Sequence, residues 1–358
     1  MKKFYSLACA IFVAALFALV ACGDTSKNNT TKESKLSVVT TIYPEFSWAK
    51  SILGNRADSV KLELLMKNGV DLHSYKPTAH DVAKIASADM VIYVGGESDE
   101  WIKDALAASP KKGRIEINLM KVLGDRVKAE EIVEGMQAEE EYEHNKVAEP
   151  AEVTHKDEHE HHAEHAEEHE HHHHHDEEVE NDEHVWLSLK NAEIIVKKIA
   201  EELSKLDAAH ATIYKQNTDA YVAQIQALDA EYRETVEKAT RKTILFGDRF
   251  PFRYLVDDYS IKYYAAFVGC SAESEASFET IAFLAGKMDA ESLPVIFTIE
   301  NSNGKIAKAV LSASKKFQNA QILILNSMQS VTEKQIAEGI DYLSLMKSNL
   351  DVLKKALN

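Results

Sequence analysis

The chain of 358 residues has few cysteines, few prolines and glycines, and no excess of basic charge. With only 6 prolines and 13 glycines, it is not collagen-like, and 45% apolar residues exclude a wholly disordered chain. A formal charge of −17 argues against a nucleic acid partner, because phosphate contacts need a basic surface. Its N-terminal apolar run, residues 7–21, is shorter than the roughly 20 residues that span a bilayer. What remains is a globular protein, long enough for about two domains.

The N-terminus has the pattern of a secretory leader. Lys2 and Lys3 precede the apolar run, which ends in the residues Leu-Val-Ala-Cys. This ending resembles the lipobox of bacterial lipoproteins, which implies a signal peptide over 1–21 and a lipid on Cys22. Residues 22–35 would be a flexible tether, and the protein would lie outside the cytoplasmic membrane, at the cell surface or in the periplasm. Cys270 would then be the one thiol without lipid, so no disulfide framework is possible.

One segment carries the whole net charge. Residues 137–183 hold 19 acidic residues and two lysines, and 12 of the 16 histidines lie between His144 and His175. With almost no apolar residues, the segment is predicted to be disordered. Tracts rich in histidine point to metal binding, and the alternative is a solvating acidic linker. The predicted auxiliary metal ligands are His155, His159, His161, His162, His165, His169, His171, His172, His173, His174 and His175.

Strands and helices are predicted to alternate on both sides of this segment, which is typical of parallel sheets. The predicted strands are 37–42, 60–65, 90–94 and 115–118, then 243–246, 262–267, 295–299 and 322–325. We therefore expect an α/β fold with two (β/α)4-type lobes, 36–206 and 241–358, and a metal site in the cleft between them. An apolar stripe from Tyr214 to Val236, uninterrupted by glycine or proline, predicts a long spine helix within 207–240 that limits hinge motion.

Two histidines outside the acidic segment are candidate ligands. His73 follows the second predicted strand, at the sheet edge where open α/β sheets bind ligands. His184 lies between the acidic segment and the next helix. Imidazole suits zinc and other borderline-soft metals, whereas carboxylates suit harder ions such as manganese. His80 and His210 fall in helical patterns with polar neighbours, and we interpret both as helix surface.

The sequence around both histidines resembles the metal-binding lipoproteins of bacterial ABC transporters for zinc and manganese, the cluster A-I substrate-binding proteins. The residues that carry the first motif are His73, Tyr75, Pro77, Ala88, Asp89, Gly95, Gly96, Glu100 and Trp101, and those of the second are Asp182, His184, Trp186 and Leu187. The resemblance covers about residues 36–358, and a histidine-rich loop between the two motifs is a feature of the zinc branch. It implies that His73 and His184 are metal ligands.

In the second lobe the resemblance is weaker. The family has a His or Glu after the first strand of this lobe, where this chain has Gly247, Asp248 and Arg249. Asp248 is the candidate third ligand, and the alternatives for it are a helix N-cap or an ion-pair partner of a nearby arginine. Asn326 occupies the place of a fourth ligand, often Asp in the family, and Glu300 is a further candidate. Three protein ligands and a water would also suffice.

The resemblance implies a receptor that captures Zn²⁺ and delivers it to the permease and ATPase of an ABC importer, acting as a lipid-anchored monomer. A manganese receptor is the alternative within transport, favoured by Asp248 and by the missing third histidine. A surface adhesin or metal buffer is a second alternative. A metal-dependent hydrolase is the weakest, because the chain has no HExxH or GxSxG motif and no Cys/His pair with a flanking base. We therefore do not expect an enzyme.

Overall fold

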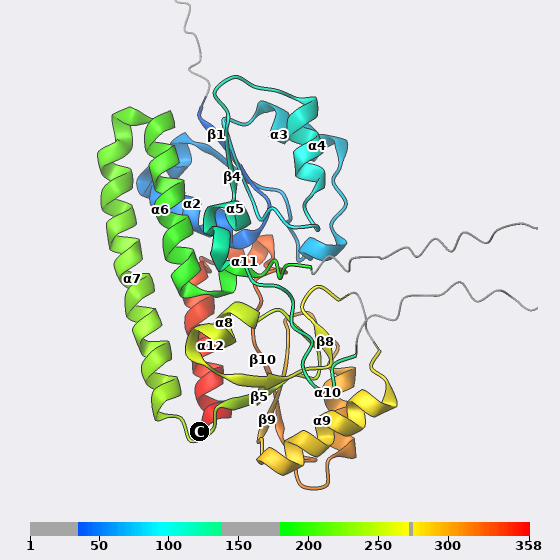
Figure 1. Ribbon diagram of the computed structural model, residues 1–358. Helices are drawn as coiled ribbons and strands as arrows, with labels where there is room; N and C mark the ends of the chain where they lie inside the picture. Colours follow the sequence, from blue (N-terminus) through cyan, green and yellow to red (C-terminus); the bar gives the residue numbers. More distant parts are fainter. Residues whose placement is uncertain (1–34, 138–179, 272–274) are drawn as a thin grey trace, which may run out of the picture. The chain divides into compact units, whose positions relative to one another are not determined.

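The first lobe is built on a four-stranded parallel sheet in the order β2-β1-β3-β4 (Figure 1). Its elements are β1 (Ser37–Thr40), α2 (Tyr43–Leu53), β2 (Lys61–Leu64), α3 (Ala79–Ser87), β3 (Met90–Tyr93), α4 (Trp101–Ala108), β4 (Ile115–Asn118) and α5 (Leu119–Leu123). All four predicted strands of this lobe are confirmed. The computed structural model describes residues 35–137, 180–271 and 275–358, so Cys22 and the histidines from 144 to 175 lie outside the described residues.

The second lobe repeats this plan. β5 pairs with β7, β9 pairs with β10, and a parallel bridge between Phe246 and Phe297 joins the two pairs. Its elements are β5 (Thr243–Leu245), β6 (Arg249–Phe250), α8 (Arg253–Tyr259), β7 (Lys262–Tyr264), β8 (Phe267–Val268), α9 (Phe278–Glu291), β9 (Val295–Thr298), α10 (Lys305–Ala313), β10 (Gln321–Ile324) and α11 (Glu333–Ala337). The short parallel pair β6–β8 was not predicted, and it brings the chain after β8 to the first lobe's histidines.

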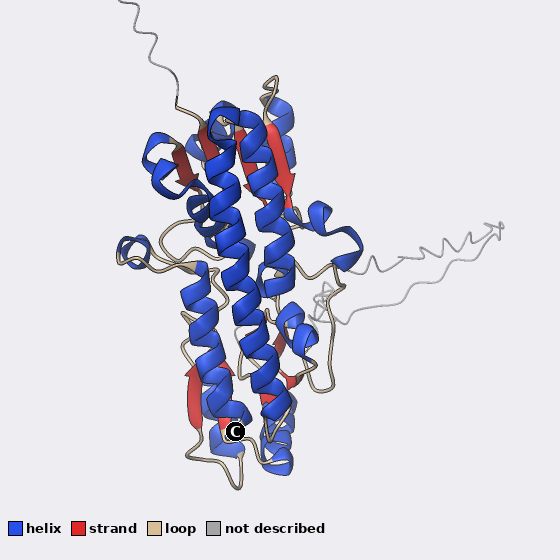
Figure 2. Ribbon diagram, turned by 90° about the vertical axis from the view of Figure 1, so that its left-hand side faces the viewer, coloured by secondary structure: helices blue, strands red, loops and turns tan. Residues whose placement is uncertain are grey.

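Three helices make a layer along one side of both sheets: α6 (Leu189–Leu206), α7 (Ala211–Lys238) and α12 (Tyr342–Leu357) (Figures 1 and 2). α7 has 28 residues and is therefore about 42 Å long at 1.5 Å per residue. It packs against α6, against α2 of the first lobe and against α12. The predicted spine helix is therefore present. Within the described residues, no helix is long and apolar enough to cross a membrane.

The central strands β1, β3, β5 and β9 are buried on both faces, which explains why they are short continuous apolar runs. Val38 and Ile92 face a large core that continues along α6 and α7 into the second lobe. Val39 and Val91 face a separate small core under α3 and α4. The second lobe has a matching small core under α9 and α10, which includes Leu245. A single shared core therefore joins the lobes, and each lobe has a private core on its far side.

The prediction that all of 137–183 is disordered is wrong at its ends. Ala129 and Asn181 form an antiparallel bridge, and the backbone N–H of Glu130 donates to Glu180 O at 2.9 Å. Asp182 and Glu183 are buried. These last residues fold because they belong to the segment that holds His184, where backbone and side-chain hydrogen bonds compensate for the burial of charge.

Candidate metal centre

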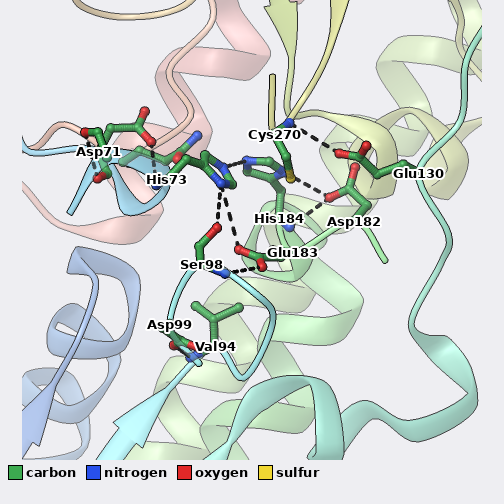
Figure 3. A network of polar contacts seen from close by, with 12 residues as sticks. Asp71, His73, Val94, Ser98, Asp99, Glu130, Asp182, Glu183, His184 and Cys270 are labelled. Carbon is green, nitrogen blue, oxygen red and sulfur yellow. Dashed lines mark hydrogen bonds and ion pairs between the residues drawn. The ribbon is translucent and has the colours of Figure 1, made fainter. Parts of the chain in front are cut away.

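His73 lies in a single 3₁₀ turn, Leu72–Ser74, in the loop that follows β2. Asp71 begins this turn, because its Oδ1 accepts the His73 backbone N–H at 3.0 Å. The same carboxylate pairs with the Arg249 guanidinium of the second lobe, so the turn is held from both sides. The ring Nδ1 of His73 lies 2.7 Å from Ser98 Oγ, and this contact leaves Nε2 directed at the His184 ring (Figure 3).

His184 is completely buried and precedes the 3₁₀ turn Val185–Leu187. Its Nδ1 lies 2.9 Å from Asp182 Oδ1, so the carboxylate accepts a proton held on Nδ1 and leaves the Nε2 lone pair free. The second lobe fixes the motif: Trp186 Nε1 donates to Ser327 O at 2.8 Å, and the Tyr254 hydroxyl donates to Asp182 O at 2.8 Å. This explains why Trp follows His at this spacing.

The two ring nitrogens meet. His73 Nε2 lies 3.1 Å from His184 Nε2, although 111 residues separate them in the chain. Two lone pairs at this distance repel each other unless a proton or a cation lies between them. Two nitrogens on one tetrahedral zinc, each about 2.0–2.1 Å from it, would be about 3.3 Å apart. The spacing therefore fits two ligands of one metal ion.

A cavity of about 370 Å³ opens from this point between the lobes. Asp71, His73 and Ser74 line it from the first lobe. Residues 247–249 and 301–303 line it from the second, together with Ser271 and Ile306. A metal ion that enters through this cavity would reach His73 before His184.

Burial controls the charge of the groups around the histidines. Burial, followed by the proximity of His184, lowers the pKa of His73 to about 3, so its ring stays neutral, which is the form that binds metal. Behind it, Glu183 Oε1 accepts the Ser98 backbone N–H at 2.8 Å. Burial raises the pKa of Asp99 to about 7, and the nearby Glu183 charge adds to this shift.

Among the described residues, one group of three side chains has the arrangement of a metal site: His73, His184 and Cys270. Their ligand atoms all lie within 4.8 Å of one another. Sequence reasoning identified the two histidines and missed Cys270, which it considered only as a thiol without a disulfide partner. The available signal was the residue type: a cysteine that forms no disulfide can bind the same metals as histidine, so Cys270 could have been considered a ligand.

The structure does not bring the other predicted ligands into this group. Asp248 lines the same cavity, where its Oδ1 accepts the Arg249 backbone N–H at 2.9 Å and burial raises the pKa of its carboxyl. Glu300 accepts four hydrogen bonds, from Ser327 N and Oγ and from the backbone of 329 and 330, so both its oxygens are occupied. Asn326 Oδ1 accepts the Met328 backbone N–H at 2.8 Å. Glu300 and Asn326 shape the loop after β10.

The two histidines interpreted as helix surface differ from those of the site. His80 is exposed in the first turn of α3. His210 is half-buried at the start of α7, where its Nδ1 lies 2.8 Å from Asp207 Oδ1.

Two lobes that enclose a polar cavity with a facing pair of histidines define the class of two-lobed α/β binding proteins. Residues 38–356 match the family model described as zinc-uptake complex component A, periplasmic, and the chain belongs to this family. It is 30% identical over 348 residues to the high-affinity zinc uptake system protein ZnuA of Bacillus subtilis, which covers 96% of each chain.

Two further comparisons involve Streptococcus pneumoniae. The zinc-binding lipoprotein AdcA is 30% identical over 355 residues, which is 99% of this chain but 61% of AdcA. The chain thus spans about three fifths of that relative. The crystal structure of the Zn(II)-bound ZnuA-like domain of AdcA aligns with a TM-score of 0.63 at 27% identity, over 90% of this chain and 99% of that domain. The family expected from the two sequence motifs is confirmed.

Proposed function

We propose that this protein is the metal receptor of a zinc importer, in which His73 and His184 bind Zn²⁺ as cargo. The observation that carries the proposal is the 3.1 Å separation of two Nε2 atoms whose opposite ring nitrogens already have partners. The names of the relatives, a zinc uptake protein and a zinc-binding lipoprotein, agree with it.

The proposal includes the partners and the location expected from the sequence. The receptor hands its metal to a permease driven by an ATPase, as a monomer outside the cytoplasmic membrane, held there by a lipid on Cys22. Residues 36–206 and 241–358 are its two lobes, joined by the helix within 207–240. The histidines between 155 and 175 collect metal weakly and raise its concentration near the cavity. The protein has no catalytic role in this proposal.

The test is zinc affinity by competition with a chelator, on the full chain and on single alanine variants. His73→Ala and His184→Ala should each weaken the tight site by more than the 10–100-fold that loss of an outer partner of a metal ligand costs. His80→Ala is the matched control, because it removes an exposed histidine from the same lobe, and it should bind as the parent does. If His184→Ala binds zinc as tightly as the parent, the proposed site is wrong.

Manganese remains the alternative cargo, and it rests on the carboxylate of Asp248 in the cavity. The same competition with Mn²⁺ in place of Zn²⁺ separates the two. Tighter binding of Mn²⁺ than of Zn²⁺ by the parent would replace the zinc proposal with the manganese one.

A further inference from the structure

We infer that Cys270 is the third ligand of the cargo site, and that its thiolate makes the site select thiophilic metals such as zinc over manganese. The inference rests on the proposed function and adds the ligand that the second lobe supplies. Figure 3 shows the Cys270 side chain beside the paired histidines, on the side away from Ser98.

The distances fit a site that tightens around its metal. In a tetrahedral zinc site, with bonds of about 2.3 Å to sulfur and about 2.0–2.1 Å to nitrogen, sulfur and nitrogen ligands are about 3.6 Å apart. The Cys270 Sγ and one ring nitrogen of each histidine all lie within 4.8 Å of one another. A movement of the Cys270 loop by about an ångström would therefore complete three ligands and leave a fourth position facing the cavity.

The loop is built to approach His184. β8 ends at Val268, and Gly269 and Cys270 are the next two residues. A Cβ on Gly269 would lie 2.9 Å from His184 Cε1 and 3.0 Å from Phe250 O. A side chain at position 269 would push the loop off the ring. The Cys270 backbone N–H donates to Glu130 Oε1 at 3.3 Å, which ties the loop to the first lobe. Sequence and packing together thus place the thiol against the imidazole.

The surroundings of Cys270 differ from those of a cysteine that only fills space. Such cysteines are buried among apolar side chains. Cys270 is half-buried, and its nearest charged neighbours are Glu130 and Asp182. A divalent cation must displace the thiol proton to bind the sulfur. Binding forms one bond from metal to sulfur and releases one proton to solvent.

The thiolate would be the anionic ligand of the site. The three carboxylates nearest the histidines already have other tasks: Asp182 accepts from His184, Glu183 from Ser98, and Glu130 from Cys270. Two neutral imidazoles and one thiolate make a soft set. Thiolates favour zinc and copper(I), whereas manganese prefers oxygen ligands. The second lobe therefore determines which metal is retained.

The experiment compares Cys270→Ser with Asp248→Asn in the full chain. Cys270→Ser keeps the shape and replaces sulfur with oxygen, while Asp248→Asn removes the other candidate third ligand. Cobalt(II) is the spectroscopic probe, because a cobalt–thiolate bond gives an intense near-ultraviolet charge-transfer band. Parent and Asp248→Asn should show the band and Cys270→Ser should lack it. Zinc affinity should fall more than 10-fold in Cys270→Ser, and its ratio of zinc to manganese affinity should fall as well.

Each outcome is decisive. If Cys270→Ser keeps the band or the zinc affinity of the parent, the inference is wrong, even though the histidine site stands. If Asp248→Asn loses affinity and Cys270→Ser does not, the third ligand is Asp248. The proposed function fails by a different result: zinc affinity that is the same in the parent and in His184→Ala. Circular dichroism and melting of Cys270→Ser should match the parent, and a variant that melts early is replaced by Cys270→Ala in the same assays.

Discussion

At the scale of single residues, a chain of buried carboxyls lies behind His73. Glu183 lies 3.9 Å from His73 Nδ1 through its Oε2. Asp99 comes next and accepts the backbone N–H groups of Val94 and Gly95, each at 2.8 Å. Glu45 follows, completely buried, with a pKa raised well above its usual value by burial and then by Asp99. Burial and mutual repulsion disfavour ionisation of both Asp99 and Glu45, so the first lobe retains protons at this place.

Asp99 therefore makes stability depend on pH. Its pKa is raised from 3.8 to about 7 in the folded protein, so the native state binds a proton that the unfolded state has lost. The contribution of Asp99 to the free energy of unfolding is therefore most favourable below about pH 4, and it is lost as the pH rises through about 7. In Asp99→Asn this dependence should vanish, so the free energy of unfolding of the metal-free parent should fall relative to the variant across that range. Urea unfolding at several pH values measures it, with Asp104→Asn as an exposed control. Parallel curves for parent and Asp99→Asn would contradict the assignment.

The sequence predicted the two histidines because each lies in a local motif. The residue type of Cys270 made it a possible ligand, but no local pattern links a cysteine after β8 to a histidine 86 positions earlier, so the sequence did not predict the contact. That contact depends on the β6–β8 pair, whose two-residue strands are too short to leave a periodic signal. Glu300 was a candidate because of its position after a strand. In the folded protein its carboxylate accepts four hydrogen bonds from the loop after β10, which the sequence alone does not reveal.

At the scale of elements, the strands of the two main sheets and the long helix α7 were predictable, and the loops and the short β6–β8 pair were not. Strands buried on both faces are continuous apolar runs, and α7 shows one apolar stripe over its length. The loop after β8 has no such pattern. Its position is fixed by Gly269, which admits the loop against the His184 ring.

Gly269→Ala tests this close approach. The added methyl group would lie within 3.1 Å of both His184 and the Phe250 carbonyl, so the loop or the ring must move. Zinc affinity should fall about 10-fold or more, comparable to loss of an outer partner of a metal ligand. Gly286→Ala is the matched control: in α9 nothing lies within 4 Å of the added methyl, and the change should stabilise the helix by about 0.5–1 kcal/mol. Equal zinc affinity in both variants would show that the loop does not need to touch His184.

At the scale of the whole molecule, several contacts connect the lobes around the site. The Asp71–Arg249 ion pair and the Trp186–Ser327 hydrogen bond cross between them. Tyr342 in α12 donates its hydroxyl proton to Trp186 O at 2.7 Å. Together with the shared core along α6 and α7, these contacts favour small movements at the metal over a wide hinge opening.

The acidic, histidine-rich segment should be separable from this body. Glu180 and Glu130 are joined by a backbone hydrogen bond, and Gln137 lies seven residues beyond Glu130, so the ends are at most about 30 Å apart. We expect that replacing residues 138–179 by a Gly/Ser linker of about ten residues leaves the melting temperature and the tight site unchanged and lowers the number of zinc ions bound. Metal analysis after dialysis measures the number, and chelator competition measures the tight site. Loss of the tight site would mean that the segment supplies its ligands.

The helix α12 has a consequence for how the chain is made. Trp48 of α2 packs edge-on against Tyr342, with ring centroids 5.1 Å apart, and the Tyr342 backbone N–H donates to Ser47 Oγ across 295 positions. The first lobe therefore cannot finish its core until the ribosome has added nearly the entire chain. Contacts this distant in sequence make folding slow and late. A nascent chain that still lacks α12 is therefore expected to be incompletely folded, because the surface of α2 that packs on Tyr342 has no partner yet.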